Sequence, residues 1–153
     1  MAKSPACISC GRTDRSFGKG KAGQCNHCYK IEWEITNPIK LRAQRLYGNA
    51  QKRCRQKGWS APDFDSAWIY DKIINGYCEV TGIPFDLYSV TNDSVHAKNP
   101  WVPSLDRIDS SKPYSKDNVQ VVVFMYNVCK AEFNHDDVIT FCKSILRQEA
   151  EIG

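Results

Sequence analysis

The segment that decides the fold is SLDRID at residues 104–109, and the chain follows it with NVQV at 118–121 and YN at 126–127. Valine dominates the stretch after the loop, and β-branched residues favour strands. Beyond it the apolar spacing becomes helical. We therefore expect strand, loop, strand and helix in that order, over 101–108, 109–118, 119–123 and 124–133.

Two oxygen-bearing side chains are spaced to meet over this loop. Asp106 would end the first strand and Asn127 would lie one turn into the helix. Such hard oxygen donors suit Mg²⁺ or Mn²⁺, and an ion there stabilises charge on a scissile phosphate. Either residue alone is better explained as structural, Asp106 as a turn cap and Asn127 as a partner of a loop carbonyl. Their joint spacing with Asn118 favours a catalytic metal site.

Length and composition restrict the protein class. The chain has 153 residues, 42% of them hydrophobic, which fits one domain with a small appended module. No run approaches the roughly 18 apolar residues of a membrane span, so we expect no membrane partner. The N-terminus lacks the pattern of a secretion signal. We expect a cytoplasmic location, in a bacterium or a phage-infected cell.

Positive charge is concentrated in one segment. The net charge is only +4, but residues 35–62 contain seven basic residues and no acidic ones. They are Lys40, Arg42, Arg45, Lys52, Arg53, Arg55 and Lys57. Clustered cations neutralise phosphates and release counterions, which predicts DNA binding. The alternative is a solvated helix face, although such faces normally mix both signs.

Four of the eight cysteines form two C-x2-C knuckles near the N-terminus: Cys7, Cys10, Cys25 and Cys28. Two knuckles can close a tetrahedral zinc site and so fold a polar loop. Disulfides are the weaker alternative in a reducing compartment. His27 lies inside the second knuckle and is not needed as a ligand. The cations of this module, Arg12, Arg15, Lys19 and Lys21, are further candidates for DNA contact.

Helical periodicity is expected to resume after Pro38, over 39–57, and Gly58 ends that helix. The apolar face is Ala43, Leu46, Tyr47, Ala50 and Cys54. Asp63 is expected to cap the next helix, which Gly76 stops. Its expected buried stripe is Phe64, Ala67, Trp68 and Ile74. Trp59 and Trp68 are expected to pack in the core.

Two further elements complete the expected fold. Residues 77–86 read as a strand with a Thr-Gly turn. A final helix is expected over 136–148, preceded by His135 in its cap region. Its apolar stripe, Val138, Phe141, Cys142 and Ile145, predicts packing against the core.

The core around the quoted segments resembles the HNH, or ββα-metal, nuclease family. That family runs Asp-His, then Asn-Leu-Gln, then a helix carrying Asn or His. The matching residues here are Asp106, Asn118 in an Asn-Val-Gln triplet, and Asn127, with Lys130 after it. The resemblance implies that Asp106 and Asn127 bind the catalytic metal and that Asn118 holds the loop through backbone hydrogen bonds.

The histidine that serves as general base in the family is Arg107 here, and arginine cannot accept a proton near neutral pH. The whole chain resembles a branch of restriction endonucleases with cysteine knuckles, a basic helical region, and Asp-Arg followed by a tyrosine. That likeness implies that Arg107 contacts the scissile phosphate and Tyr114 assists. His96 is a further candidate base, and attack by water without a protein base is the alternative.

The chain departs from that branch at two places. The branch has a second four-cysteine zinc site, but the corresponding stretches here, 78–81 and 123–126, hold one cysteine. A single structural zinc is therefore expected, with Cys78 and Cys129 in the core. The branch also has a histidine after the basic helix, where this chain has Gly58 and Trp59.

These observations predict an α+β protein with a four-cysteine zinc module at 1–34, a basic helical DNA-binding segment at 35–76 and a ββα-metal core with a C-terminal helix at 77–153. The expected function is endonucleolytic hydrolysis of double-stranded DNA with Mg²⁺ or Mn²⁺. A restriction-like enzyme would need a homodimer to cut both strands, whereas a phage or homing-type enzyme would act alone. The competing hypotheses are a catalytically inactive DNA-binding module of the same fold and a zinc-ribbon adaptor for proteins.

Overall fold

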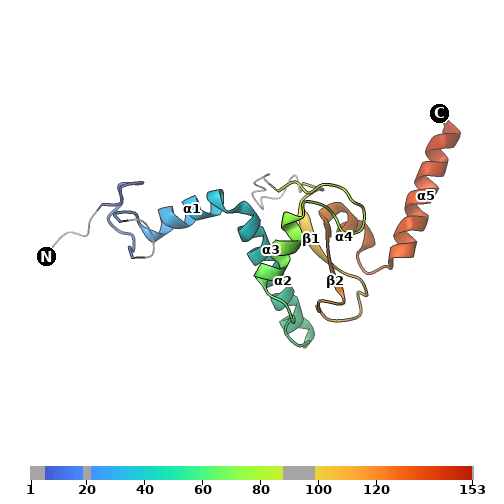
Figure 1. The fold of residues 1–153 in the computed structure, drawn as a ribbon, viewed down its shortest axis with the longest axis horizontal. Helices are drawn as coiled ribbons and strands as arrows, with labels where there is room; N and C mark the ends of the chain where they lie inside the picture. The colour runs from blue at the N-terminus through green and yellow to red at the C-terminus, as the bar shows by residue number, and fades with distance from the viewer. Residues whose placement is uncertain (1–5, 19–21, 88–98, 153) are drawn as a thin grey trace.

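The computed structural model describes residues 6–18, 22–87 and 99–152 (Figure 1). Within those ranges it has five helices and two strands. They are α1 (Asn26–Thr36), α2 (Pro38–Lys57), α3 (Ser66–Ile74), β1 (Pro103–Arg107), β2 (Val119–Val123), α4 (Phe124–Lys130) and α5 (His135–Ile152). The predicted α+β class is confirmed.

The centre of the molecule is the antiparallel pair β1 and β2, with Asp106 opposite Gln120 in the register. The second strand has the bounds expected from its valines, and three consecutive members, 121–123, are buried. The helix α4 begins directly after β2 and packs on both strands. Helices α2 and α3 pack on each other and also contact the strands. The predicted order of strand, strand and helix is thus confirmed.

Helix α2 is the longest element, and its ends follow the sequence closely. Pro38 is its first residue, because proline suits the first helical position, where its missing N–H is not needed. Gly58 ends it with a left-handed φ of 69°, a conformation that glycine adopts without strain. Its residues Ala43, Ala50 and Cys54 are buried, as the periodicity predicted.

Helix α3 corrects two expectations. Its N-cap is Asp65, whose side chain accepts a hydrogen bond from the backbone N–H of Trp68 at 2.9 Å. Asp63, the expected cap, instead accepts from the backbone N–H of Lys116 at 2.8 Å. The later start shifts the helix phase, so Ile69 and Ile73 are buried. Of the expected stripe, Phe64 is buried and stacks on the partly buried Trp68, but Ala67 and Ile74 are exposed.

Residues 77–86 do not form the expected strand. They make a tight turn with a single bridge between Tyr77 and Pro84, and Gly82 has a φ of 68°. Pro84 cannot donate to a ladder, which limits strand pairing here. The expected Thr-Gly turn is present, and Cys78 is buried beside it as predicted.

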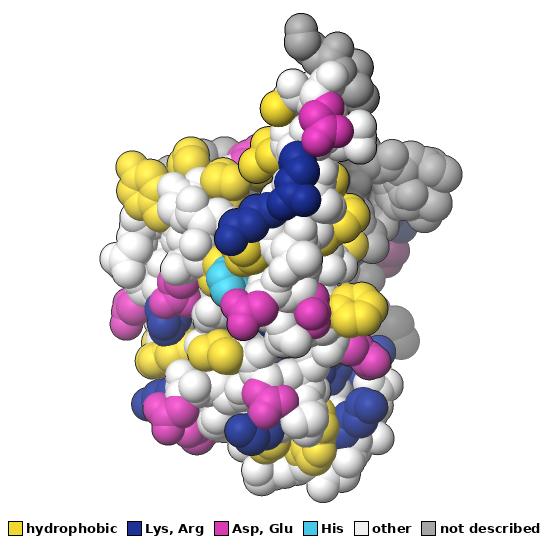
Figure 2. Space-filling view, turned by 90° about the vertical axis from the view of Figure 1, so that its right-hand side faces the viewer, with side chains coloured by type: hydrophobic (Ala, Val, Ile, Leu, Met, Phe, Trp, Pro, Cys, Tyr) yellow, Lys and Arg dark blue, Asp and Glu magenta, His cyan; other side chains and the backbone are white. Residues whose placement is uncertain are grey.

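The expectation that α5 packs on the core is wrong. In Figure 1 this helix projects away from the body toward the C-terminus. Of its apolar stripe only Val138 is buried, and Phe141 and Ile145 are 58% and 46% exposed. Hydrophobic side chains are therefore visible among charged ones on this face of the molecule (Figure 2). Cys142, and Cys129 on α4, are exposed rather than core residues.

None of the helices in the described part of the chain is long and apolar enough to span a membrane.

Candidate active site

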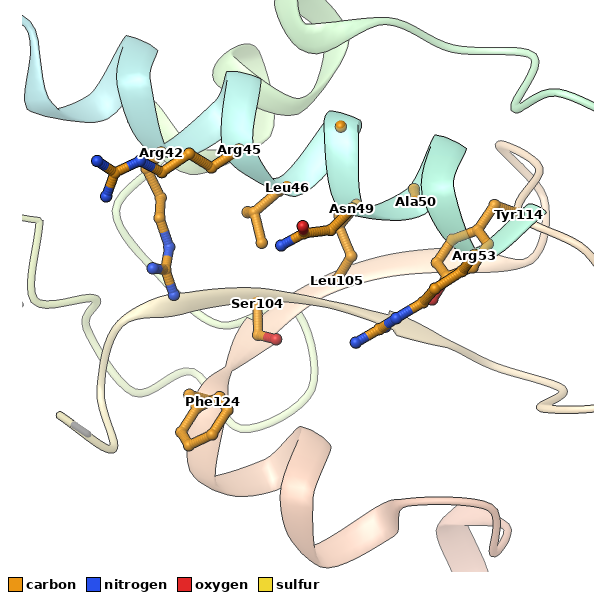
Figure 3. Close-up of a pocket in the computed structure, with 11 residues that line it drawn as sticks. Arg42, Arg45, Leu46, Asn49, Ala50, Arg53, Ser104, Leu105, Tyr114 and Phe124 are labelled. Atoms are coloured by element: carbon orange, nitrogen blue, oxygen red, sulfur yellow. The ribbon is translucent and has the colours of Figure 1, made fainter. Parts of the chain in front are cut away.

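A cleft of about 520 Å³ lies between α2 and β1 (Figure 3). One wall carries Arg42, Arg45 and Arg53 of α2; the side chains of Arg42 and Arg53 extend toward the strand, and that of Arg45 runs along the helix. Arg42 and Arg53 share a helix face because they are eleven residues apart, close to three whole turns, and Arg45 lies about 60° around the helix from them. The remaining lining residues are Leu46, Gly48, Asn49, Ala50, Ser104, Leu105, Tyr114 and Phe124. The cleft therefore combines three cations with a strand backbone.

The cations predicted from the basic segment fall into two groups. Arg42, Arg45 and Arg53 line the cleft, and the Nε of Arg42 also donates to the carbonyl of Pro103 at 2.9 Å. That bond fastens α2 to the start of β1. The other four, Lys40, Lys52, Arg55 and Lys57, are exposed and do not line the cleft.

Arg107 and Tyr114, predicted to act together, are neighbours, and Tyr114 lines one end of the cleft. The guanidinium of Arg107 lies 5.2 Å from the ring centre of Tyr114 and 5.0 Å from that of Trp59, within the range of cation–π attraction. The buried Tyr114 hydroxyl accepts a hydrogen bond from Nη1 of Arg53 at 2.8 Å. Two guanidinium groups thus converge on one tyrosine.

Asp106 points to the opposite side of β1 from Arg107, because successive strand residues alternate. It is 3% exposed, and both carboxylate oxygens are hydrogen bonded. Oδ2 accepts from Nε2 of Gln120 at 2.8 Å, and Oδ1 accepts from Nζ of Lys130 at 3.2 Å. Sequence reasoning noted Lys130 but gave it no role; its position three residues after Asn127 was the signal that both face β1.

Asn127 lies against the residues that precede Asp106. Its Nδ2 donates to Oγ of Ser104 at 2.7 Å and to the carbonyl of Leu105 at 2.9 Å. Ser104 also lines the cleft, so this hydrogen bond connects the arginine-lined space with α4. The amide oxygen of Asn127 and the carboxylate of Asp106 are the hard donors that Mg²⁺ prefers. The donor set fits a divalent ion, although Lys130 already contacts the carboxylate.

The loop between the strands is held from inside by Asn118. Its Oδ1 accepts from the backbone N–H of Asp109 at 2.9 Å, and its Nδ2 donates to the carbonyls of Asp109 and Pro113. The carboxylate of Asp109 accepts from Ser111, and that bonding, together with Lys112, lowers the pKa of Asp109 to about 2. These bonds fix the segment between Arg107 and Tyr114.

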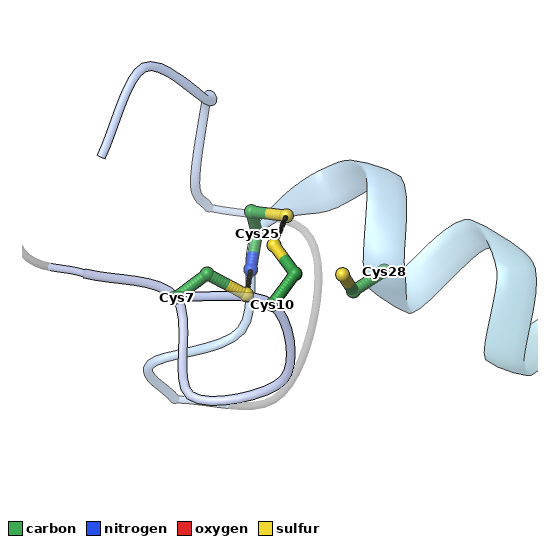
Figure 4. Close-up of side chains that lie close together, drawn as sticks. All are labelled: Cys7, Cys10, Cys25 and Cys28. Atoms are coloured by element: carbon green, nitrogen blue, oxygen red, sulfur yellow. Dashed lines mark hydrogen bonds between the residues drawn. The ribbon is translucent and has the colours of Figure 1, made fainter. Parts of the chain in front are cut away.

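The four N-terminal cysteines converge, and their sulfur atoms lie within 4.8 Å of one another (Figure 4). The backbone N–H of Cys25 donates to Sγ of Cys7 and lowers the pKa of that thiol to about 6. Hydrogen bonding with Cys10 raises the pKa of Cys28 to about 12. A divalent cation among the sulfurs stabilises all four as thiolates. This four-cysteine group could hold a zinc ion.

The other candidates from the sequence analysis are histidines and cations near the N-terminus. His96, Lys19 and Lys21 fall outside the described residues. Nδ1 of His135 is hydrogen bonded to the hydroxyl of Tyr126 at 3.0 Å. Near the four cysteines, His27 is exposed and Arg15 is partly buried, while Arg12 is paired with Asp14 at 3.0 Å.

No family model and no curated protein match the chain. Among solved structures, it is similar to the rare-cutting HNH restriction endonuclease PacI. The two chains are 21% identical, with 94% of each covered and a TM-score of 0.44. Because this is a distant likeness, we base the function proposed below on the residues of this chain.

Proposed function

We propose that the chain is a divalent-metal-dependent DNA endonuclease that hydrolyses phosphodiester bonds beside β1. The observation that carries the proposal is the arginine-lined cleft, which runs along the strand that bears Asp106 and Arg107. Arginine binds phosphate groups through two hydrogen bonds of its planar guanidinium. Three such groups lining one cleft therefore suit a DNA backbone. Hydrolysis also requires groups that act on the scissile phosphate. Asp106 and Asn127 carry oxygen atoms of the kind that bind Mg²⁺.

The residues divide into binding and reacting roles. Arg42, Arg45 and Arg53 would receive the DNA backbone. Arg107 would contact the scissile phosphate from the side of β1 opposite to Asp106, as a permanent positive charge that cannot act as a base. A divalent ion held by Asp106 and Asn127 would stabilise negative charge on the phosphate and the leaving 3′ oxygen.

Three groups are proposed as candidates for the proton acceptor. The Tyr114 hydroxyl is the first candidate, because its oxygen accepts a hydrogen bond from the cleft residue Arg53 while Arg107 lies over its ring. His96 is the second candidate, and water activated by the metal or the phosphate is the third. One such site cleaves one strand, so a double-strand cut by a restriction-like enzyme would require a homodimer.

The test is cleavage of supercoiled plasmid in Mg²⁺ or Mn²⁺ by the zinc-loaded protein. Asp106→Asn is the informative variant, because its amide oxygen can still accept from Lys130, whereas alanine would remove the only carboxylate that the structure pairs with that buried ammonium among the described residues. The matched control is Asp71→Asn, on the exposed side of α3. We expect cleavage by the wild type and the control and none by Asp106→Asn. Equal cleavage by all three proteins would refute the assignment.

One observation favours a second candidate function, a DNA-binding module without catalysis. Lys130 and Gln120 already occupy both carboxylate oxygens of Asp106. This alternative expects salt-sensitive DNA binding that Asp106→Asn leaves unchanged, with no cleavage in any metal. A zinc-ribbon adaptor for proteins, by contrast, expects no salt-sensitive DNA affinity.

A further inference from the structure

Lys130 is a buried lysine that none of the proposed catalytic roles uses. Lys130 is 1% exposed, and lysines are almost never buried to this degree without a partner. Nζ donates to Oδ1 of Asp106 at 3.2 Å, to the carbonyl of Arg107 at 2.8 Å and to Oγ of Ser110 at 3.4 Å. Three acceptors therefore match the three protons of the ammonium group.

The fold fixes this ammonium beside the candidate metal ligands. Lys130 is the last residue of α4, where the helix dipole favours a cation. Asn127, one turn earlier on the same face, bonds to Ser104 and the carbonyl of Leu105. The two side chains of α4 thus bracket Asp106 along β1, and the ammonium contacts the carboxylate that a divalent ion would use.

We propose that Lys130 is a positioning residue that competes with the divalent ion for Oδ1 of Asp106 and so sets the metal concentration that the site requires. In the metal-free protein the ammonium neutralises and orients the carboxylate. When the ion binds, it must displace Nζ or share the oxygen with it, and two cations at such a distance repel strongly in a buried site. The inference rests on the proposed metal site at Asp106.

The test measures Mn²⁺ affinity by calorimetry on zinc-loaded protein without DNA. Lys130→Gln removes the charge but keeps an amide that can donate to the carbonyl of Arg107, and Lys130→Arg keeps the charge. We expect Lys130→Gln to bind Mn²⁺ at least about tenfold more tightly than the wild type. A tenfold change is only a small part of the repulsion expected between the ammonium and a divalent ion that share one oxygen. Lys130→Arg should bind no more tightly than the wild type. A purely structural role would change both variants alike.

The Asp106→Asn variant distinguishes failure of the metal site at Asp106 from failure of the competition by Lys130. If it abolishes Mn²⁺ binding while Lys130→Gln binds as the wild type does, the competition is refuted and the metal site stands. If Asp106→Asn binds Mn²⁺ unchanged, the metal site and the competition both fail.

A measurement on the wild type covers the case in which Lys130→Gln does not fold. Protein labelled with ¹⁵N-lysine should give a protected side-chain NH₃⁺ signal from Lys130, the one buried lysine of the described residues, because buried hydrogen-bonded ammonium protons exchange slowly with solvent. Titration with Mg²⁺ should shift or remove that signal, and Asp106→Asn should abolish the response. A signal that stays unchanged at saturating Mg²⁺ would overturn the competition.

Discussion

Replacing the cleft arginines should reduce the salt dependence of DNA binding more than replacing other cations of the same helix. The variant is Arg45→Gln with Arg53→Gln, both exposed and both lining the cleft. Arg42 is left intact because its bond to Pro103 fastens α2 to β1. The control is Arg55→Gln with Lys57→Gln, which removes the same charge from exposed positions outside the cleft.

The expected magnitude follows from counterion release. Each phosphate contact contributes about 0.9 to the slope of log affinity against log salt concentration, so two lost contacts reduce that slope by about 1.8. The affinity gap between wild type and cleft variant should then shrink about 12-fold from roughly 50 to 200 mM salt. The control variant removes equal net charge without contacts in the cleft, and its slope should stay close to that of the wild type.

The assay is fluorescence anisotropy with a labelled duplex in chelator, over a series of KCl concentrations. Chelator prevents cleavage, and the melting temperature of each variant checks that α2 remains folded. Equal reductions in slope for the two double variants would refute a specific role for the cleft, because charge alone would then explain binding. Unchanged slopes in both would remove α2 from the DNA interface.

Three other perturbations have defined outcomes. Tyr114→Phe should slow cleavage by roughly 100-fold if the hydroxyl takes part in proton transfer, with DNA affinity unchanged; full activity would leave water or His96 as the acceptor. Cys25→Ser should lose zinc, measured by metal analysis, and should melt at a lower temperature; an unchanged metal content would contradict a structural zinc site. Asp109 has a pKa lowered to about 2 by Ser111 and Lys112, so its stabilising bonds are complete above its unfolded pKa of about 3.9 and are lost as pH falls toward 2. Asp109→Asn should therefore melt earlier than the wild type near pH 6, and the difference should vanish near pH 2; a pH-independent difference would contradict the linkage.

Residue types near the ends of an element predicted its boundaries where those residues alone decide them. The valines of β2 set its bounds correctly, and the glycine after Lys57 ends α2 as expected. The two C-x2-C knuckles bring their four sulfurs together because the first is a turn and the second is the first turn of α1. The shared face of Arg42 and Arg53 was available from the sequence, since eleven residues are close to three helical turns, but periodicity does not separate Arg45 from Lys57, which lies four residues after Arg53.

Other features depend on tertiary contacts that periodicity does not report. The apolar stripe of α5 predicts that a face could be buried, but not that a surface of the same chain meets it, and Phe141 remains exposed. Asp63 and Asp65 are both good caps by residue type, and the contact of Asp63 with the backbone of Lys116, 53 residues away, decides between them. The burial of Lys130 has no local signal beyond its spacing from Asn127.

The most direct test of the central claim is the chemistry of the nick. Supercoiled plasmid is incubated with zinc-loaded wild type or Asp106→Asn in Mg²⁺, and the nicked product is then treated with DNA ligase. Metal-assisted departure of the 3′ oxygen predicts 3′-hydroxyl and 5′-phosphate ends, so nicks made by the wild type should be resealed, and Asp106→Asn should make none. Nicking that persists in Asp106→Asn, or complete absence of nicking by the wild type in both Mg²⁺ and Mn²⁺, would contradict a metal-dependent nuclease centred on Asp106.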